Sequence, residues 1–248
     1  MLETAVKAAK KAGELQIRSF GKKIIVDEEL RFDTKLALDK ESERLIVDTI
    51  LAEFPDHSII AEESGVTDNS SDYTWIIDPL DGTANFSRNI PQFCSSIALL
   101  HKSEKILGVV FDPVRNELFH AEKGKGSFLN GRKINTRHTA KINELFVVCG
   151  FMKSEETIKK GLVIFNALIE RVKKIRIMGA AALDLCWLAA GRFDVYFEYG
   201  IMDWDIAAGE LILKEAGGDI KADALGNHSY NVTATNGKIK PEEFLGLI

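Results

Sequence analysis

Cysteine is scarce in this sequence, and its placement shows no pattern of disulfides or metal ligands. The 248 residues contain three cysteines, Cys94, Cys149 and Cys186, which stand far apart with no C-x-x-C pair. No histidine is spaced to complete a zinc site with them, and the five histidines show no H-E-x-x-H pattern. We therefore expect reduced, buried cysteines, and the sequence excludes the common zinc-site patterns.

Long hydrophobic runs and an excess of positive charge are also missing. No stretch approaches 18 apolar residues, and the first residues lack the apolar segment of an export signal. We expect a cytoplasmic protein that does not contact a membrane. With 32 Lys and Arg against 37 Asp and Glu, the net charge is −5. This balance disfavours nucleic acid as a partner and favours small molecules or metal cations.

The glycine-rich signatures of nucleotide-binding proteins are absent too, since the chain has neither a P-loop nor a Rossmann fingerprint. What is present is ordinary globular composition, with 46% hydrophobic and 28% charged residues. A chain of this length can bury roughly three quarters of the surface that it exposes when unfolded. We expect one domain over residues 1–248, with possible sub-layers at 1–138 and 139–248.

The spacing of apolar residues predicts a change of architecture along the chain. In the first part the predicted elements are helices near 2–21 and 39–54, strands at 58–61 and 73–77, and an antiparallel meander over 94–134. In the second part they are strands at 145–149, 174–178 and 193–197, alternating with helices at 155–172, 180–190 and 204–216. Residues 21–38 are polar, and we expect them to be mobile. The order indicates an α+β half followed by an α/β half in stacked layers.

Carboxylates follow two of the predicted strands. Asp78 and Asp81 come directly after the strand ending at residue 77, and Glu62 ends the other strand 16 residues upstream (78 − 62 = 16). Pro79 favours extended backbone at Asp78, so Asp81 can turn back and both carboxylates can converge on one point. If the two strands pair, Glu62 reaches the same edge of the sheet.

The residues after Asp81 favour a bound anion. Gly82 lets a ligand approach the backbone closely, and the amides of Gly82 and Thr83 form an anion site if a helix begins there. Asp-Pro and Asp-Gly are also ordinary turn signals, so this segment alone favours neither interpretation.

A fourth acid, Asp205, lies far downstream in the first turn of a predicted helix, where a helix cap is the ordinary interpretation. Clustering Glu62, Asp78, Asp81 and Asp205 as bare anions would be costly, and divalent cations remove that cost. Oxygen ligands without His or Cys suit Mg²⁺ or Mn²⁺, and a paired site can clamp the attacking and leaving oxygens of a phosphoryl transfer.

At these residues the chain resembles the inositol monophosphatase family of lithium-sensitive, metal-dependent sugar phosphatases, which also includes fructose-1,6-bisphosphatase. The resemblance covers nearly the whole chain and lies in the segments IAEES at 60–64, WIIDPLDGT with NF at 75–86, GAAALDLC at 179–186, and WD with AAG at 204–209. It implies a layered α/β/α/β/α sandwich, a homodimer, and up to three Mg²⁺ per chain, with Mn²⁺ as an alternative.

The resemblance also implies roles for individual residues. The ligands of the first metal are Glu62, Asp78 and the carbonyl of Leu80, and those of the second are Asp78, Asp81 and Asp205. Asp39 holds the waters of a weaker third ion beside Glu62. Glu62 and Thr83 form the catalytic pair that orients the nucleophilic water. The residues that contact the substrate are Asp81, Gly82, Thr83, Gly179, Ala180, Ala181, Glu198 and Asp205.

Two features indicate the substrate. Asn85-Phe86 resembles the inositol phosphatase branch rather than the members that cleave 3′-phosphoadenosine phosphates. Glu198 matches the position where inositol-type enzymes place an acid against sugar hydroxyls, although without the resemblance it is interpreted as an exposed glutamate at a strand end. We expect Mg²⁺-dependent hydrolysis of a small phosphorylated polyol or sugar, first of all myo-inositol 1-phosphate. The alternatives are fructose 1,6-bisphosphate, histidinol phosphate, or a non-catalytic dimeric regulatory role.

One position departs from the family pattern. Family members often carry a lysine in the segment before the second helix, and Glu28 stands at the comparable spacing here. The basic residues that could take its place are Lys22, Lys23, Arg31 and Lys35, and the sequence favours none of them.

Overall fold

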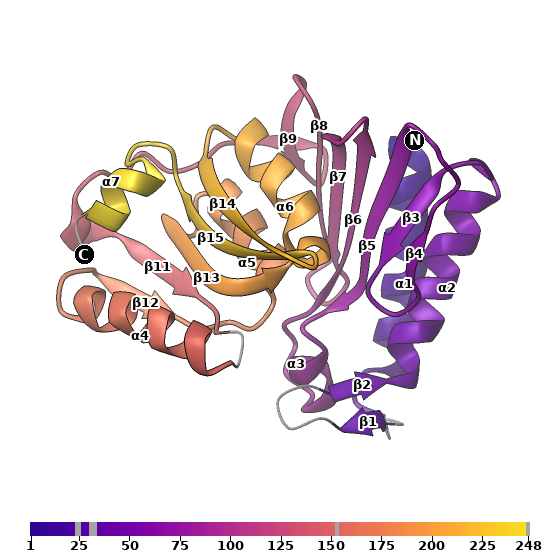
Figure 1. Ribbon diagram of the computed structural model, residues 1–248, viewed down its shortest axis with the longest axis horizontal. Coiled ribbons are helices and arrows are strands. Elements are labelled where there is room, and N and C mark those ends of the chain that lie inside the picture. The colour runs from indigo at the N-terminus through magenta and orange to yellow at the C-terminus, as the bar shows by residue number, and fades with distance from the viewer. Residues whose placement is uncertain (23–25, 30–33, 152–153, 247–248) are drawn as a thin grey trace.

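The computed structural model describes residues 1–22, 26–29, 34–151 and 154–246, and it is built from five layers that alternate helix and sheet (Figure 1). Helices α1 and α2 cover the outer face of an eight-stranded sheet, and α5 and α6 lie between this sheet and a five-stranded one. Helices α4 and α7 cover the far side. The predicted α/β/α/β/α order is confirmed.

The first layer consists of α1 (Leu2–Ser19) and α2 (Ala37–Leu51). Trp75 and Ile77 pack against these helices, whereas Ile76 between them packs on the opposite face, as the two-residue period of a strand requires. Helix α2 ends three residues earlier than predicted (54 − 51 = 3). Pro55 explains this, because the residue before a proline is disfavoured in helical backbone.

The eight-stranded sheet has the strand order β10-β9-β8-β7-β6-β5-β3-β4. Its strands are β3 (Ser58–Ala61), β4 (Gly65–Thr67), β5 (Tyr73–Asp81), β6 (Cys94–His101), β7 (Glu104–Asp112), β8 (Glu117–Glu122), β9 (Gly126–Leu129) and β10 (Arg132–Ile134). From β5 to β10 the neighbours are antiparallel, which confirms the meander. Strand β3 pairs with β5 in parallel, so both strands end at the same edge. Strand β4 was not predicted.

The middle layer consists of α5 (Ala181–Ala189) and α6 (Asp203–Glu215). Every residue of α5 is buried, as expected for a helix that is apolar on all sides and lies between two sheets. Helix α6 lies so close to β7 that a Cβ on Gly108 would come within 2.7 Å of the Ala208 carbonyl oxygen. The beginnings of both helices therefore have fixed positions relative to the large sheet.

The five-stranded sheet has the order β12-β11-β13-β15-β14. Its strands are β11 (Phe146–Cys149), β12 (Lys174–Arg176), β13 (Val195–Met202), β14 (Asp219–Gly226) and β15 (Ser229–Thr235). Strands β12, β11 and β13 are parallel, which confirms the α/β prediction for this part. The β14–β15 hairpin was missed. Its turn residues Asn227 and His228 both have positive φ, at 49° and 60°, as in a tight hairpin turn.

The outer layer consists of α4 (Glu155–Ile169) and α7 (Pro241–Gly246), whose Leu168 and Phe244 pack against Phe197 of β13. Short helices cover Thr83–Ser87 (α3) and Ile142–Glu144. All three cysteines are free and buried, as predicted. Among the described residues, no helix combines the length and the apolar character needed to cross a membrane.

The polar segment 21–38, predicted to be mobile, contains two paired strands, β1 (Val26–Glu29) and β2 (Thr34–Leu36). Lys23 and Arg31, two of the basic candidates, lie outside the described residues. Lys22 is exposed, and Lys35 lies in β2.

Candidate active site

A bulge in β5 turns Asp78 and Asp81 to the same side of the sheet. Asp78 pairs with Ser96, and Asp81 pairs with Cys94. Between these two pairs the chain advances three residues along β5 (81 − 78 = 3) but only two along β6 (96 − 94 = 2). Residues three apart in a regular strand point to opposite faces, and one extra residue cancels that reversal. The convergence predicted from the Asp-Pro-Leu-Asp spacing is confirmed, and the bulge is its cause.

Two buried polar side chains hold the bulge. Gln16 of α1 donates from Nε2 to the Pro79 carbonyl at 2.8 Å and to Ser95 Oγ at 3.0 Å, and the Ser95 hydroxyl donates to the same carbonyl at 3.0 Å. Both side chains are fully buried. Gln16 precedes Pro79 by 63 residues (79 − 16 = 63), so no local sequence pattern indicates this contact.

Within the segment that follows the bulge, side chains and backbone fix each other. The Leu80 amide donates to Asp78 Oδ1 at 2.9 Å, and the Thr83 hydroxyl donates to the Leu80 carbonyl at 2.8 Å. The carbonyl that the resemblance makes a metal ligand is therefore also the group that orients the proposed catalytic hydroxyl.

Asp205 joins the two carboxylates from the first turn of α6. Its Oδ2 accepts from the Met202 amide at 3.1 Å, which fixes the start of the helix. Ligand oxygens of Asp78, Asp81 and Asp205 all lie within 4.8 Å of one another, and we call these three residues the acidic cluster. It unites residues that are 127 positions apart in the chain (205 − 78 = 127).

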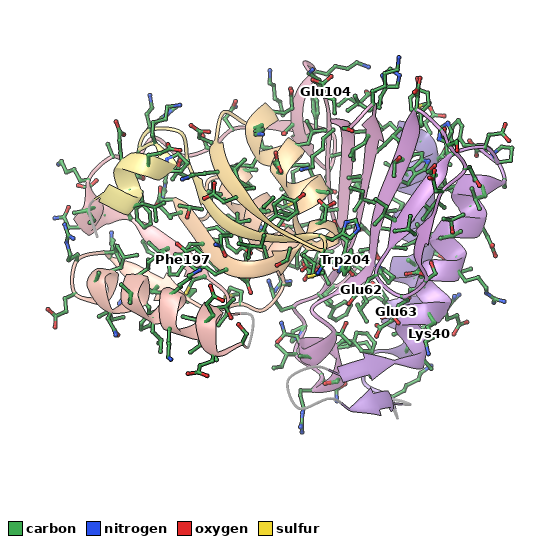
Figure 2. All side chains as sticks on the ribbon, viewed as in Figure 1. Lys40, Glu62, Glu63, Glu104, Phe197 and Trp204 are labelled. Carbon is green, nitrogen blue, oxygen red and sulfur yellow. The ribbon has the colours of Figure 1, made fainter. Side chains whose placement is uncertain are left out.

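Glu62 lies beside the acidic cluster. Its amide donates to the Ile77 carbonyl at 3.2 Å, which continues the parallel pairing of β3 with β5. Figure 2 shows Glu62 at the end of the large sheet, and its charge contributes to the raised pKa of Asp78. The turn after it is held by Glu43 of α2, which accepts from the Glu63 and Ser64 amides at 2.8 and 2.9 Å. Sequence reasoning missed Glu43.

The electrostatics of the cluster favour a bound cation. Burial raises the pKa of Asp78 well above its usual range, and the charges of Glu62, Asp81 and Asp205 raise it further. Burial likewise raises the pKa of Asp205, with contributions from Asp81 and Glu62. A divalent cation would cancel this repulsion, and carboxylate oxygens without nitrogen or sulfur suit Mg²⁺. The residues therefore fit the metal that the resemblance implies.

Asp81 also binds the start of α5. It accepts from the Ala181 amide at 3.2 Å and from the Ala182 amide at 2.8 Å. Burial raises the pKa of Asp81 to about 6, and these bonds together with the Cys94 thiol limit the rise. Of the predicted substrate contacts, Ala180 and Ala181 thus lie next to the acidic cluster, and the Ala181 amide already has a carboxylate partner.

Two glycines among the predicted contacts, Gly82 and Gly179, have positive φ and lie close to other segments of the chain. Gly82 precedes α3 with φ +91°, and a Cβ there would lie 2.7 Å from the Gln92 carbonyl oxygen. Gly179 has φ +75° and contacts Asn85. The Asn85 amide group donates to the carbonyls of Gln92 and Met178 at 3.0 and 2.9 Å, which joins α3 to the loop before α5.

Two further predicted residues, Asp39 and Glu198, lie on elements that do not contribute to the acidic cluster. Asp39 is 3% exposed and accepts from the Leu36 amide at 2.8 Å, which caps α2. Glu198 lies within β13, not at a strand end, because the strand continues to Met202. It is 9% exposed, so the interpretation as an exposed glutamate is wrong. Burial raises the pKa of Glu198 to about 7. The hydrogen bond from Tyr196 lowers this pKa, and the charge of Asp81 raises it.

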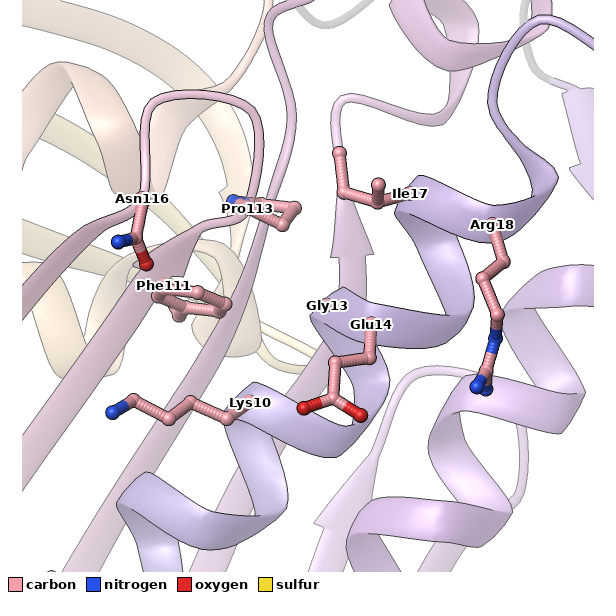
Figure 3. Close-up of a pocket in the computed structure, with 8 residues that line it drawn as sticks. All are labelled: Lys10, Gly13, Glu14, Ile17, Arg18, Phe111, Pro113 and Asn116. Carbon is pink, nitrogen blue, oxygen red and sulfur yellow. The ribbon is translucent and has the colours of Figure 1, made fainter.

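A separate cavity of about 460 Å³ lies between α1 and the end of β7 (Figure 3). Phe111 and Pro113 form part of its apolar lining, and Lys10, Glu14 and Arg18 contribute charged side chains. None of the predicted site residues lines it. The cavity is therefore distinct from the candidate active site.

Comparisons with known proteins find relatives over almost the whole chain. The profile of the inositol monophosphatase family matches residues 1–243. Nus factor SuhB of Pasteurella multocida strain Pm70 is 42% identical over 234 residues, which cover 93% of this chain and 87% of that protein.

Two solved structures share the fold over almost the whole chain. Extragenic suppressor protein suhB from Bartonella henselae has a TM-score of 0.92 and 33% identity, covering 99% of this chain and 97% of its own. Inositol monophosphatase from Anabaena (Nostoc) sp. PCC 7120 has a TM-score of 0.87 and 36% identity, covering 99% and 94%. The chain therefore belongs to the inositol monophosphatase family.

Proposed function

We propose that this protein is a Mg²⁺-dependent phosphatase that hydrolyses a small phosphate monoester, with myo-inositol 1-phosphate as its substrate. The observation that carries the proposal is the acidic cluster with Glu62 beside it, in a chain of the inositol monophosphatase family. Asp205 caps α6 through Oδ2, but a helix cap does not require three carboxylates within 4.8 Å with a fourth adjacent, and this clustering supports cation binding.

The proposed metal ligands are Glu62, Asp78, Asp81, Asp205 and the Leu80 carbonyl, for up to three Mg²⁺ or Mn²⁺ ions, with Asp39 supporting the third. Bound cations would supply the positive charge that lowers the pKa of a water and stabilises charge on the phosphate. The chain's own contribution is orientation. The Glu62 carboxylate and the Thr83 hydroxyl would hold the nucleophilic water in line with the phosphorus, and the Thr83–Leu80 hydrogen bond limits the rotation of that hydroxyl.

Substrate recognition is assigned to two groups of residues. Gly82, Thr83 and the 179–181 segment would contact the phosphate, because they surround Asp81 closely. Glu198 would accept hydrogen bonds from polyol hydroxyls, since its buried carboxylate is influenced by the charge of Asp81 and therefore lies near the cluster. The homodimer remains part of the proposal through the resemblance.

A second candidate function is supported by a specific observation. The Pasteurella multocida relative is named a Nus factor, as is that of Escherichia coli, and because neither name states an enzymatic activity they support the regulatory alternative. The complete set of four acids favours catalysis, because a purely regulatory protein has no need to hold carboxylates at such cost.

Phosphate release from three esters in the presence of Mg²⁺ tests the proposal. We expect the highest kcat/KM on myo-inositol 1-phosphate, compared with fructose 1,6-bisphosphate and histidinol phosphate, and no release when EDTA is added. A higher kcat/KM on either of the other esters would change the substrate but keep the chemistry. No release from any of them would favour the regulatory function.

A further inference from the structure

Tyr196 and Gly150 contact the carboxylate of Glu198 closely. We call Glu198, Tyr196 and Gly150 the Glu198 seat. The Tyr196 hydroxyl donates to Glu198 Oε2 at 2.9 Å. Tyr196 is fully buried and Glu198 is 9% exposed, so this bond is shielded from solvent. A shielded bond to a carboxylate fixes its rotamer more strongly than an exposed one.

Tyr196 and Glu198 point to the same face of β13 because they are two residues apart. Tyr196 packs in the core formed with α5 and α6, whereas Phe197 packs on the other face against α4. Figure 2 shows Phe197 on the α4 side of this sheet. The seat therefore faces the middle layer, from which the start of α5 reaches Asp81.

Gly150 closes the seat from the neighbouring strand. Its amide donates to the Phe197 carbonyl at 3.2 Å, which extends the parallel pairing of β11 with β13 by one residue. A Cβ at this position would lie 1.9 Å from Glu198 Oε2 and 2.2 Å from its Cδ. The φ angle of Gly150 is not positive, so the constraint at this position comes from the closeness of the Glu198 carboxylate, which would have to shift to admit a Cβ, and not from backbone conformation.

The seat hydrogen-bonds one carboxylate oxygen, Oε2, and packs against both, because a Cβ on Gly150 would also lie 2.5 Å from Oε1. Among the described residues, the Tyr196 hydroxyl is the hydrogen-bond donor to Glu198, and it uses Oε2. Oε1 accepts no hydrogen bond from the described residues, and we assign it as the acceptor for a ligand hydroxyl. Because Tyr196 fixes the carboxylate plane and Gly150 fixes its distance from β11, the direction in which Oε1 can accept is fixed too.

We propose that Tyr196 and Gly150 are positioning residues that orient Glu198 toward a substrate hydroxyl and so determine the preference for polyol phosphates. This inference rests on the proposed function. Neither residue contacts the acidic cluster through any hydrogen bond in the described part of the chain. Their effect should therefore fall on discrimination between substrates and on the KM for the polyol ester.

The first experiment is Tyr196→Phe, which removes one hydroxyl and keeps the ring. We expect the KM for myo-inositol 1-phosphate to rise roughly three- to tenfold, the size of one lost hydrogen bond, while kcat stays within about twofold. The ratio of kcat/KM between this ester and p-nitrophenyl phosphate should fall by the same factor. Tyr199→Phe is the matched control, because Tyr199 lies on the same strand and packs on the opposite face, in the core that includes Phe197 and α4.

The second experiment uses thermal stability, which does not depend on activity. Gly150→Ala forces the Glu198 carboxylate to move, since that group is the far end of a flexible side chain. We expect a lower Tm in the wild-type background and no decrease when Glu198→Ala has already made room. In kinetics, Gly150→Ala should lower the substrate ratio as strongly as Glu198→Gln does, and adding Tyr196→Phe to Glu198→Gln should have no further effect.

The outcomes separate the inference from the function on which it rests. If Tyr196→Phe lowers kcat on both esters equally, or adds its full effect to Glu198→Gln, the inference is overturned and the proposed function stands. An equal loss of Tm for Gly150→Ala in both backgrounds also overturns it. A wild-type protein that hydrolyses neither ester contradicts the proposed function itself, and the inference is then overturned with it.

Discussion

The acidic cluster and the Glu198 seat lie close together, but the neighbours of their carboxylates differ. In the acidic cluster, three carboxylates lie within 4.8 Å of one another and raise one another's pKa values. In the Glu198 seat, a single carboxylate contacts a phenol hydroxyl and a glycine. Only seven residues separate Glu198 from Asp205 in the chain (205 − 198 = 7). This difference underlies our proposal that the cluster binds cations and that the seat recognises neutral hydroxyls.

The largest effect should come from removing one charge of the cluster. Asp78→Asn or Asp205→Asn keeps the side-chain shape but removes a proposed metal ligand. We expect kcat for phosphate release to fall by about three orders of magnitude or more, with a higher Mg²⁺ concentration needed for half-maximal rate. The measurement is steady-state phosphate release over a Mg²⁺ series.

The matched control for this prediction is Asp223→Asn, an exposed aspartate of β14 that forms an ion pair with Lys221. It should behave as wild type. Near-wild-type turnover of Asp78→Asn at saturating Mg²⁺ would show that the cluster is not the catalytic metal site.

Lithium should act on the cluster and not on the seat. A monovalent cation that replaces a weakly held Mg²⁺ would retain the phosphate product, as the resemblance suggests. Inhibition of inositol 1-phosphate hydrolysis should therefore be uncompetitive or mixed with respect to substrate. Initial rates at several Li⁺ and substrate concentrations test this, and purely competitive inhibition would place Li⁺ elsewhere.

A smaller effect should come from the seat. Glu198→Gln keeps the shape but weakens the acceptor, so the KM for myo-inositol 1-phosphate should rise roughly tenfold. The kcat/KM ratio should shift by the same factor toward p-nitrophenyl phosphate, which offers no polyol hydroxyls. Equal losses on both esters would mean that Glu198 supports the acidic cluster or the fold.

The smallest effect should appear in the pH dependence of stability. Folding raises the pKa of Asp81 to about 6 and that of Glu198 to about 7, so the folded state binds protons more tightly than the unfolded state. In EDTA, the unfolding free energy should therefore fall as pH rises through 4 to 6 for Asp81 and through 4.5 to 7 for Glu198. The slope is at most about 1.4 kcal/mol per pH unit for each group.

Denaturant titrations of wild type, Asp81→Asn and Glu198→Gln separate these two contributions. Mg²⁺ binding needs an ionised Asp81. Saturating Mg²⁺ should therefore weaken the pH dependence of stability that comes from Asp81 more than the pH dependence that comes from Glu198. Asp81→Asn and Glu198→Gln each remove one of these two contributions. If Mg²⁺ weakened both contributions to the pH dependence equally, the proposal that only the acidic cluster binds the cation would be contradicted.

Local sequence patterns were sufficient to predict most of the cluster. A strand followed by Asp-Pro-Leu-Asp predicts two converging carboxylates, and the parallel pairing of β3 with β5 brings Glu62 to the same edge. Asp205 could be placed only because the chain resembles a known family, since an acid in a first helical turn is ordinary by itself.

The supporting contacts could not be predicted, because they join residues far apart in the sequence. Gln16 bonds to Pro79 over 63 residues, and the closeness of Gly150 to Glu198 follows from β11 and β13 being neighbours in the sheet. The burial of Glu198 was missed because the strand was predicted to end at residue 197, whereas β13 continues to Met202. The β14–β15 hairpin had a signal in Gly226-Asn227 that was overlooked.

Direct measurement of metal binding tests the central claim without reference to any substrate. Mn²⁺ bound to the protein can be counted from the electron paramagnetic resonance signal of the free ion, for wild type, Asp205→Asn and Asp223→Asn. We predict saturable Mn²⁺ binding that Mg²⁺ displaces in wild type and Asp223→Asn, and the loss of at least one ion, or an affinity weakened by tenfold or more, in Asp205→Asn. Identical Mn²⁺ titrations for wild type and Asp205→Asn would contradict the assignment of the acidic cluster as the metal site.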